Sequence, residues 1–226
     1  MKKISLAIFI LALTIGLVFS TNCSFGGINN FGESVKGSGT SKSEQRNLTG
    51  FKQIEAGGAV NLEVDAQKDF SVVIKADDNL LQYIKTEVSG DTLKIYSEGK
   101  ISPTTKLNVK ISMPMLEGLN VSGASDAKIN NVKADSLELK ASGASEIIIN
   151  GEAKELKADA SGASKIDAEN LRTENADVDA SGASSANVSA INELNIDASG
   201  ASKISYTGEP KNIKQNASGA SSINKQ

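Results

Sequence analysis

The sequence predicts an all-β fold: a right-handed parallel β-helix, or β-solenoid, with coils of about 19 residues, preceded by a small β subdomain. The tetrapeptide Ser-Gly-Ala-Ser occurs six times, beginning at Ser122, Ser142, Ser161, Ser181, Ser199 and Ser218. Between the copies, small or aliphatic residues alternate with charged or amide residues, the period-2 pattern of strands with one buried face. A repeat of this length indicates equivalent units that stack on one another.

A single repeat buries too few aliphatic side chains to offset the conformational entropy that its ordering costs. The repeats therefore have to stack, each pairing its backbone with the coils on either side at a spacing of about 4.8 Å. The Ser-Gly-Ala-Ser quartet fits either a tight corner or a narrow waist, where only small side chains stack in register. The sequence leaves both possibilities open.

Residues 47–116 form the expected β subdomain, which would cap the first coil of the repeat region, residues 117–226. Alternation predicts strands at Phe51–Glu55, Ala59–Val64, Phe70–Lys75, Ile84–Val88, Thr92–Tyr96 and Leu107–Ser112. Ser89-Gly90-Asp91 predicts a hairpin turn, and Asp77–Leu81 predicts a short, capped helical turn. We interpret Gly57-Gly58-Ala59-Val60 as a degenerate first copy of the repeat.

The N-terminus is typical of an export signal. Two lysines precede an apolar run at residues 4–19, which is shorter than the roughly 18 apolar residues of a membrane-spanning helix. The only cysteine, Cys23, follows directly, an arrangement that resembles bacterial lipoproteins, in which this cysteine is diacylated. We therefore expect residues 1–22 to be a lipoprotein signal peptide and Cys23 to be lipidated, although Ser20 and Asn22 depart from the usual cleavage pattern.

Two alternatives stay open for this segment: a secreted protein with a free thiol, or an uncleaved anchor. Residues 23–46 are rich in glycine, serine and asparagine, with apolar residues only as singles. Such a composition buries too little surface to fold, so we expect a flexible tether.

Composition excludes several classes of function. The chain has no histidine and one cysteine, so the usual zinc, haem and iron–sulfur ligand sets cannot form. Ser-His and Cys-His catalytic pairs are excluded for the same reason. A net charge of −3 gives no basic footprint for nucleic acid. We expect no cofactor and no catalytic residues.

Three carboxylates come into line if the repeats stack. Asp159, Asp179 and Asp197 each precede a repeat glycine by three residues, so stacking places them in one outer column, where like charges repel. Hard cations prefer carboxylate oxygens, so a weak Ca²⁺ site is one interpretation. We favour the alternative, a solvated acidic stripe, because no Asp-rich loop spacing accompanies the column.

An enzyme is the least favoured interpretation. Some β-helix proteins cleave polysaccharides, and paired carboxylates can hydrolyse glycosidic bonds. A sugar-binding groove usually needs aromatic platforms and directed donors. Residues 117–226 contain one aromatic residue, Tyr206, and one arginine, Arg172.

Several segments together resemble the "putative autotransporter adhesin, head GIN domain" family of bacterial envelope proteins. They are Phe51-Lys52-Gln53-Ile54, Gly57-Gly58-Ala59-Val60, Asp77-Asp78-Asn79-Leu80, Thr92-Leu93-Lys94-Ile95 and the Ser-Gly-Ala-Ser series. The resemblance covers about residues 47–226 and rests on a repeat pattern rather than on catalytic signatures. It implies an all-β, solenoid-like fold on exported or lipid-anchored proteins, and it supplies no binding residues.

Together these features predict a non-enzymatic, exported lipoprotein of the bacterial cell envelope, anchored by its lipid in the outer membrane. We expect a surface adhesion or binding module with an extracellular or envelope ligand. The alternative is a structural scaffold lipoprotein that faces the periplasm. The chain stops in mid-coil at Gln226, and the polar residues 224–226 would blunt that end. An open sheet edge still remains, so end-to-end self-association is a further expectation.

Overall fold

The computed structural model describes residues 34–226, a unit whose buried side chains form one continuous hydrophobic core. The expected signal peptide, Cys23 and the first part of the expected tether lie outside the described residues. Within residues 34–226, no helix is long and apolar enough to cross a membrane.

The unit is built almost entirely of strands, as predicted. The first part contains β1 (Val35–Lys36), β2 (Ser41–Arg46), β3 (Gln53–Ala56), β4 (Val60–Ala66), β5 (Ser71–Asp77), the 3-10 helix η1 (Leu81–Tyr83), β6 (Ile84–Ser89), β7 (Thr92–Ser97), β8 (Ile101–Ser102), β9 (Leu107–Met113) and β10 (Gly118–Val121). The repeat region contributes β11 (Asp126–Ala141), β12 (Glu146–Ala160), β13 (Lys165–Ala180), β14 (Ser185–Ala198), β15 (Lys203–Thr207), β16 (Asn212–Ala217) and β17 (Ser222–Lys225). Every strand predicted before residue 117 lies within two residues of its observed bounds.

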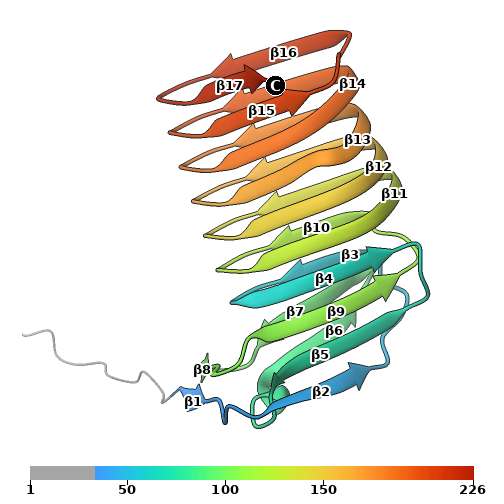
Figure 1. Ribbon diagram of the computed structural model, residues 1–226, viewed down its shortest axis with the longest axis vertical. Helices are drawn as coiled ribbons and strands as arrows, with labels where there is room; N and C mark the ends of the chain where they lie inside the picture. Colours follow the sequence, from blue (N-terminus) through green and yellow to red (C-terminus); the bar gives the residue numbers. More distant parts are fainter. Residues whose placement is uncertain (1–33) are drawn as a thin grey trace, which may run out of the picture. The chain divides into compact units, whose positions relative to one another are not determined.

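The predicted β-solenoid is confirmed. Each strand from β11 to β14 runs along one side of a coil, bends and returns along the other, and neighbouring coils pair in parallel about 20 residues apart. In Figure 1 the Ser-Gly-Ala-Ser corners stack along the left edge and the bends along the right. Alternate side chains point inward: Leu139, Ala158, Val178 and Ile196 stack as one fully buried row.

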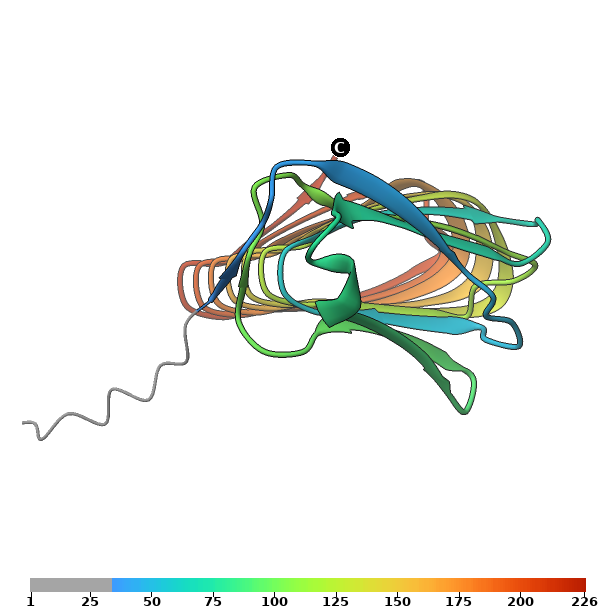
Figure 2. The same ribbon diagram turned by 90° about the horizontal axis from the view of Figure 1, so that it is seen from below.

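Two sheet faces enclose the interior, as the view along the stack shows (Figure 2). The first halves of the coils continue through β4, β9, β5 and β2, and the second halves continue through β10, β3, β7 and β6. The strands of residues 47–116 therefore extend the same two faces and share the core of the repeats.

The parallel stack ends in strands that reverse direction. β5 runs antiparallel to β9, β2 antiparallel to β5, and β6 antiparallel to β7. The last pair meets at the predicted hairpin turn, where Gly90 has a φ of +60°. The predicted helical turn is present as η1, but no side chain caps it, so the capping role expected for Asp77–Leu81 is wrong.

The flexible tether expected over residues 23–46 is wrong for residues 35–46. β2 pairs with β5 along its whole length, and β1 pairs with β8. β2 is polar because it is an edge strand with mostly exposed side chains, so backbone hydrogen bonds hold it rather than burial.

A buried carboxylate fastens this N-terminal segment to the rest of the unit. Asp77 is fully buried and accepts backbone hydrogen bonds from Gly39, Thr104 and Thr105 at 2.8 to 3.0 Å. Burial acts to raise the pKa of Asp77, but the hydrogen bonds from Thr105, Thr104 and Gly39 outweigh it and hold the pKa below its ordinary value of 3.8. A Cβ at Gly37 would collide with the Asp77 carboxylate, so only glycine fits at position 37.

The Ser-Gly-Ala-Ser quartet is a corner, not a waist. Its glycines have φ between +72° and +81°, a conformation that favours glycine. A Cβ on Gly182 would lie 2.8 Å from the carbonyl oxygen of Gly162 in the coil before. The next alanine, Ala183, donates its N–H to that same oxygen at 2.7 Å, and every copy repeats this bond. Gly58 accepts the first bond of the series, which confirms the degenerate first copy.

The last serine of the quartet points into the interior. The Ser164 hydroxyl donates to the carbonyl of Ala141 at 2.9 Å, and the Ser184 hydroxyl donates to that of Ala160 at 3.0 Å. These buried hydroxyls are satisfied by backbone of the preceding coil, so they add a second link between coils at the corner.

We predict that Gly182→Ala destabilises the unit by roughly 2–4 kcal/mol, because the positive φ costs about 1–2 kcal/mol and the Cβ also meets the coil before. Urea unfolding of residues 34–226 measures this. Ala183→Ser, at the next and exposed position, is the control and should change stability by less than about 0.5 kcal/mol. Equal effects of the two variants would contradict the stacked corner.

We predict that Asp77→Asn lowers the melting temperature by several degrees at pH 7. The folded pKa lies below the unfolded one, so the ionised carboxylate stabilises the fold above about pH 4 and the contribution is lost as pH falls through the folded pKa. The difference in melting temperature between wild type and variant should therefore shrink below about pH 4. A difference that stays constant from pH 7 to pH 3 would show that Asp77 does not act through its charge.

Candidate functional site

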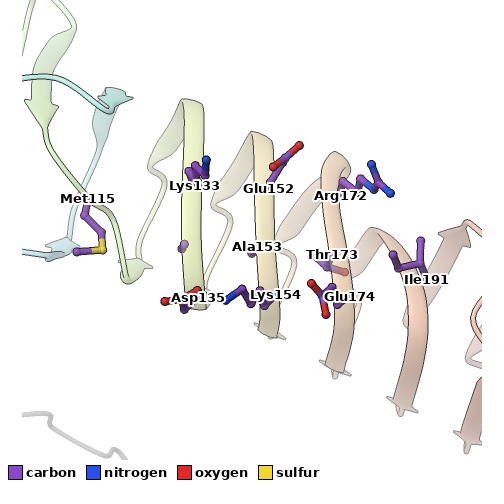
Figure 3. Close-up of a pocket in the computed structure, with 11 residues that line it drawn as sticks. Met115, Lys133, Asp135, Glu152, Ala153, Lys154, Arg172, Thr173, Glu174 and Ile191 are labelled. Carbon is purple, nitrogen blue, oxygen red and sulfur yellow. Dashed lines mark ion pairs between the residues drawn. The ribbon is translucent and has the colours of Figure 1, made fainter.

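A shallow groove crosses the bends of the coils, on the side opposite to the corners (Figure 3). It has a volume of about 410 Å³ and is lined by Met115, Lys133, Ala134, Asp135, Glu152, Ala153, Lys154, Arg172, Thr173, Glu174 and Ile191. We call it the bend groove.

The bends are where the coils differ in length. The pairing of β11 with β12 shifts register between Ile129 and Val132, and the later pairs shift at the same bend. Asn131 and Gly151 take up the extra residues with φ of +61° and +133°. The corners stay constant, so differences between repeats accumulate at the bend groove.

Small side chains form the floor of the bend groove. Ala134, Ala153 and Thr173 pair in register and are buried, because they point inward between two outward positions on each strand. In Figure 3, Lys133, Glu152 and Arg172 project to one side of this floor, and Asp135, Lys154 and Glu174 project to the other. We call these two rows the upper rail and the lower rail.

In the lower rail, Lys154 neutralises Asp135, and Glu174 leaves the row with a net charge of −1. Lys154 Nζ lies 2.7 Å from the Asp135 carboxylate. This hydrogen bond and the attraction of the two charges raise the pKa of Lys154 and lower that of Asp135. The nearby carboxylate of Glu174 also favours the charged form of Lys154.

The upper rail is available to a partner. Lys133, Glu152 and Arg172 alternate in sign, and among residues 34–226 none of them forms an ion pair. The exposed thioether side chain of Met115 lies at one end of the groove. The site can thus offer both charge signs and an apolar contact to an extended ligand.

The bend groove is not predicted by the repeat pattern of the sequence. Lys133 follows its repeat glycine by ten residues and Glu152 by nine, so counting from the corner does not align them. Met115 lies before the first Ser-Gly-Ala-Ser copy. Arg172 is the only arginine in residues 117–226, and that isolation is the signal that the sequence offers for this groove.

The structure brings the predicted aspartate column together. Asp159, Asp179 and Asp197 pair in register on the outer side of the second face. Burial, followed by the charges of Asp159, Asp177 and Asp197, raises the pKa of Asp179. Residues 34–226 contain no group of three or more carboxylate, histidine or cysteine side chains arranged to hold a metal ion. The column is a line of repelling charges.

We predict that Asp179→Asn stabilises the unit at pH 7 by roughly 0.2–1 kcal/mol, because it removes like-charge repulsion. Asn216 already shows the favourable alternative in this column, since its amide donates to Asp197 at 2.8 Å. The folded pKa of Asp179 lies above the unfolded one, so the gain should be full at pH 7 and vanish below pH 3.8. Thermal melts check this, with the exposed Glu169→Gln as control; a loss of stability in Asp179→Asn would refute the repulsion.

Comparison with solved structures shows the same fold in other bacterial proteins. A putative adhesin from Bacteroides fragilis NCTC 9343 is similar with a TM-score of 0.72 and 20% identity, over 85% of this chain and 100% of that one. A putative lipid binding protein from Parabacteroides distasonis ATCC 8503 has a TM-score of 0.55 and 21% identity, over 86% and 100% of the two chains. A putative adhesin from Parabacteroides merdae ATCC 43184 has a TM-score of 0.57 and 18% identity, over 86% and 99%. These likenesses show the fold alone.

No curated protein matches the chain. A family model does: the one described as "Putative auto-transporter adhesin, head GIN domain" matches residues 50–210. This match spans most of the chain and agrees with the resemblance found in the sequence. The chain therefore belongs to the putative auto-transporter adhesin, head GIN domain family.

Proposed function

We propose that this chain is a non-enzymatic binding module of the bacterial cell envelope, anchored through a lipid on Cys23, that presents the bend groove to a ligand at the cell surface. The observation that carries the proposal is the upper rail, whose charges have no partner among residues 34–226. The family's description as an adhesin, and the names of two of the similar structures, point the same way.

The groove suits an extended ligand that lies along the stack, perpendicular to the strands. Its floor of alanine and threonine lets a ligand backbone approach closely. Lys133, Glu152 and Arg172 recur at the coil spacing of about 4.8 Å, so a partner with groups of both signs at a similar spacing gains contacts on successive coils. A uniformly charged polymer would meet Glu152 or its cationic neighbours with the wrong sign.

The groove offers poor conditions for acid–base catalysis. A general acid at neutral pH needs a raised pKa, whereas the ion pair with Lys154 lowers the pKa of Asp135. Glu174 lies beside the same lysine.

A periplasmic scaffold is the second candidate, and its sheet edge would be the means of self-association. β16 presents that edge, with the Ile213 side chain 43% exposed. Sedimentation of residues 34–226 tests the scaffold: reversible association that rises with concentration would favour it, and a strict monomer would argue against it.

We predict that Arg172→Glu weakens ligand binding at least tenfold, since it reverses one charge of the upper rail. The measurement is binding of purified residues 34–226 to an array of glycans and peptides that carry both charge signs. Lys214→Glu makes the same charge change on β16, away from the groove, and should bind like wild type. Equal binding by wild type and Arg172→Glu would rule out the bend groove as the ligand site.

We also predict that a non-permeant protease digests the protein on intact cells, and that Cys23→Ala releases it from membranes. Lipidation and surface exposure together account for both results. Protection from protease until the outer envelope is permeabilised would contradict the surface module and favour the scaffold.

A further inference from the structure

We propose that a second groove, on the first sheet face, binds a phosphomonoester group. It lies over β4, β5, β9 and β11 and has a volume of about 460 Å³. The lining residues that carry the argument are Asn61, Glu63, Lys75, Asn108, Lys110 and Lys128. We call it the lysine groove.

Strand register gathers the cations of the lysine groove. Glu63 on β4 pairs with Lys110 on β9 and with Lys128 on β11, which places the three side chains in one outward column. Lys75 on β5 pairs with Asn108 on β9. These two residues lie in the neighbouring outward column, two residues along their strands from the column of Glu63 and Lys110. Lysines from three different strands therefore line one hollow.

The charge of the groove matches a phosphomonoester. Three lysines and one glutamate give it a net charge of +2, in a chain whose net charge is −3. Lys110 lies 3.4 Å from Glu63, while Lys75 and Lys128 form no ion pair with any described residue. A phosphomonoester carries about −1.5 to −2 at pH 7, and lysine binds phosphate as a point charge. A single carboxylate, with one charge, would leave part of the groove's charge unmatched.

Neutral side chains in the groove favour an organic phosphate over the bare ion. Asn61 donates one amide hydrogen to Asn108 at 3.3 Å and keeps another for a ligand. Val73, which is half-buried, lies in the same groove and offers apolar contact to the body that carries the phosphate.

A discrete phosphate group is favoured over a flat anionic surface. In the outward column that contains Asn108 and Asn61, the next two positions are Asp126 and Glu146. Their carboxylates would be pressed against the headgroups of an anionic bilayer laid over this face. A small phosphomonoester in the hollow avoids them.

The test is calorimetric titration of residues 34–226, a compact unit with its own core, with phenyl phosphate and with inorganic phosphate. We expect phenyl phosphate to bind more tightly than the inorganic ion, and added salt to weaken both. The double variant Lys75→Gln/Lys128→Gln should weaken binding at least tenfold, and Lys203→Gln/Lys214→Gln, on β15 and β16, should not change it. Unchanged melting temperatures would show that both double variants fold.

Two results would overturn the proposal: equal titration of wild type and Lys75→Gln/Lys128→Gln, or no heat at millimolar phosphate. A third arm uses vesicles of phosphatidic acid in phosphatidylcholine. Sedimentation with these vesicles in the absence of binding to soluble phosphate would assign the lysines to a membrane surface and refute a discrete phosphate site. Arg172→Glu should titrate like wild type, which separates this site from the bend groove.

Discussion

The structure depends on one backbone hydrogen bond repeated at every corner, from the alanine N–H of one Ser-Gly-Ala-Ser quartet to the glycine carbonyl of the coil before, at 2.7 Å. The glycine makes it possible, because any Cβ at that position would meet the carbonyl that accepts the bond. Since each corner lies directly over the last, the register of both faces is set there. Side chains at equivalent positions then form continuous columns, buried inside and charged outside. The buried rows and the aspartate column are both products of that register.

The corner and the bend have different roles in each coil. The corner is constant in sequence and in φ, whereas the bend absorbs the extra residues of the longer coils. A position that tolerates length changes also tolerates new side chains, and the bend groove lies there. The fold thus separates the residues that hold the stack from those that vary on its surface. This separation suits a binding module, whose ligand contacts can change without loss of the core.

Much of the fold could be predicted from the sequence, because a strict repeat makes burial periodic. The inward rows as far as β14, the aspartate column and the first copy at Gly58 lie where counting from the repeat glycine places them. Ile213 and Ala217 of β16 are exposed, because no further coil covers them. Whether the Ser-Gly-Ala-Ser quartet forms a corner or a waist is decided by the φ angle of its glycine and by its main-chain hydrogen bonds. Amino-acid composition reports neither. β2 was missed because an edge strand is held by its backbone and can be wholly polar. The lysine groove was missed because β9 and β4 pair outside the repeat count. The bend groove was missed because the register between coils shifts at the bends.

Amide hydrogen exchange at the corners tests the central claim most directly. The side chains of Ala144, Ala163 and Ala183 are exposed, and in an ordinary surface turn their N–H groups would exchange quickly. Here each N–H donates to the coil before, so we predict that these amides are protected as strongly as those of buried Ile147 and Val178. Fast exchange at these alanines, with slow exchange in the strands, would show that the hydrogen bonds at the corners do not hold neighbouring coils together.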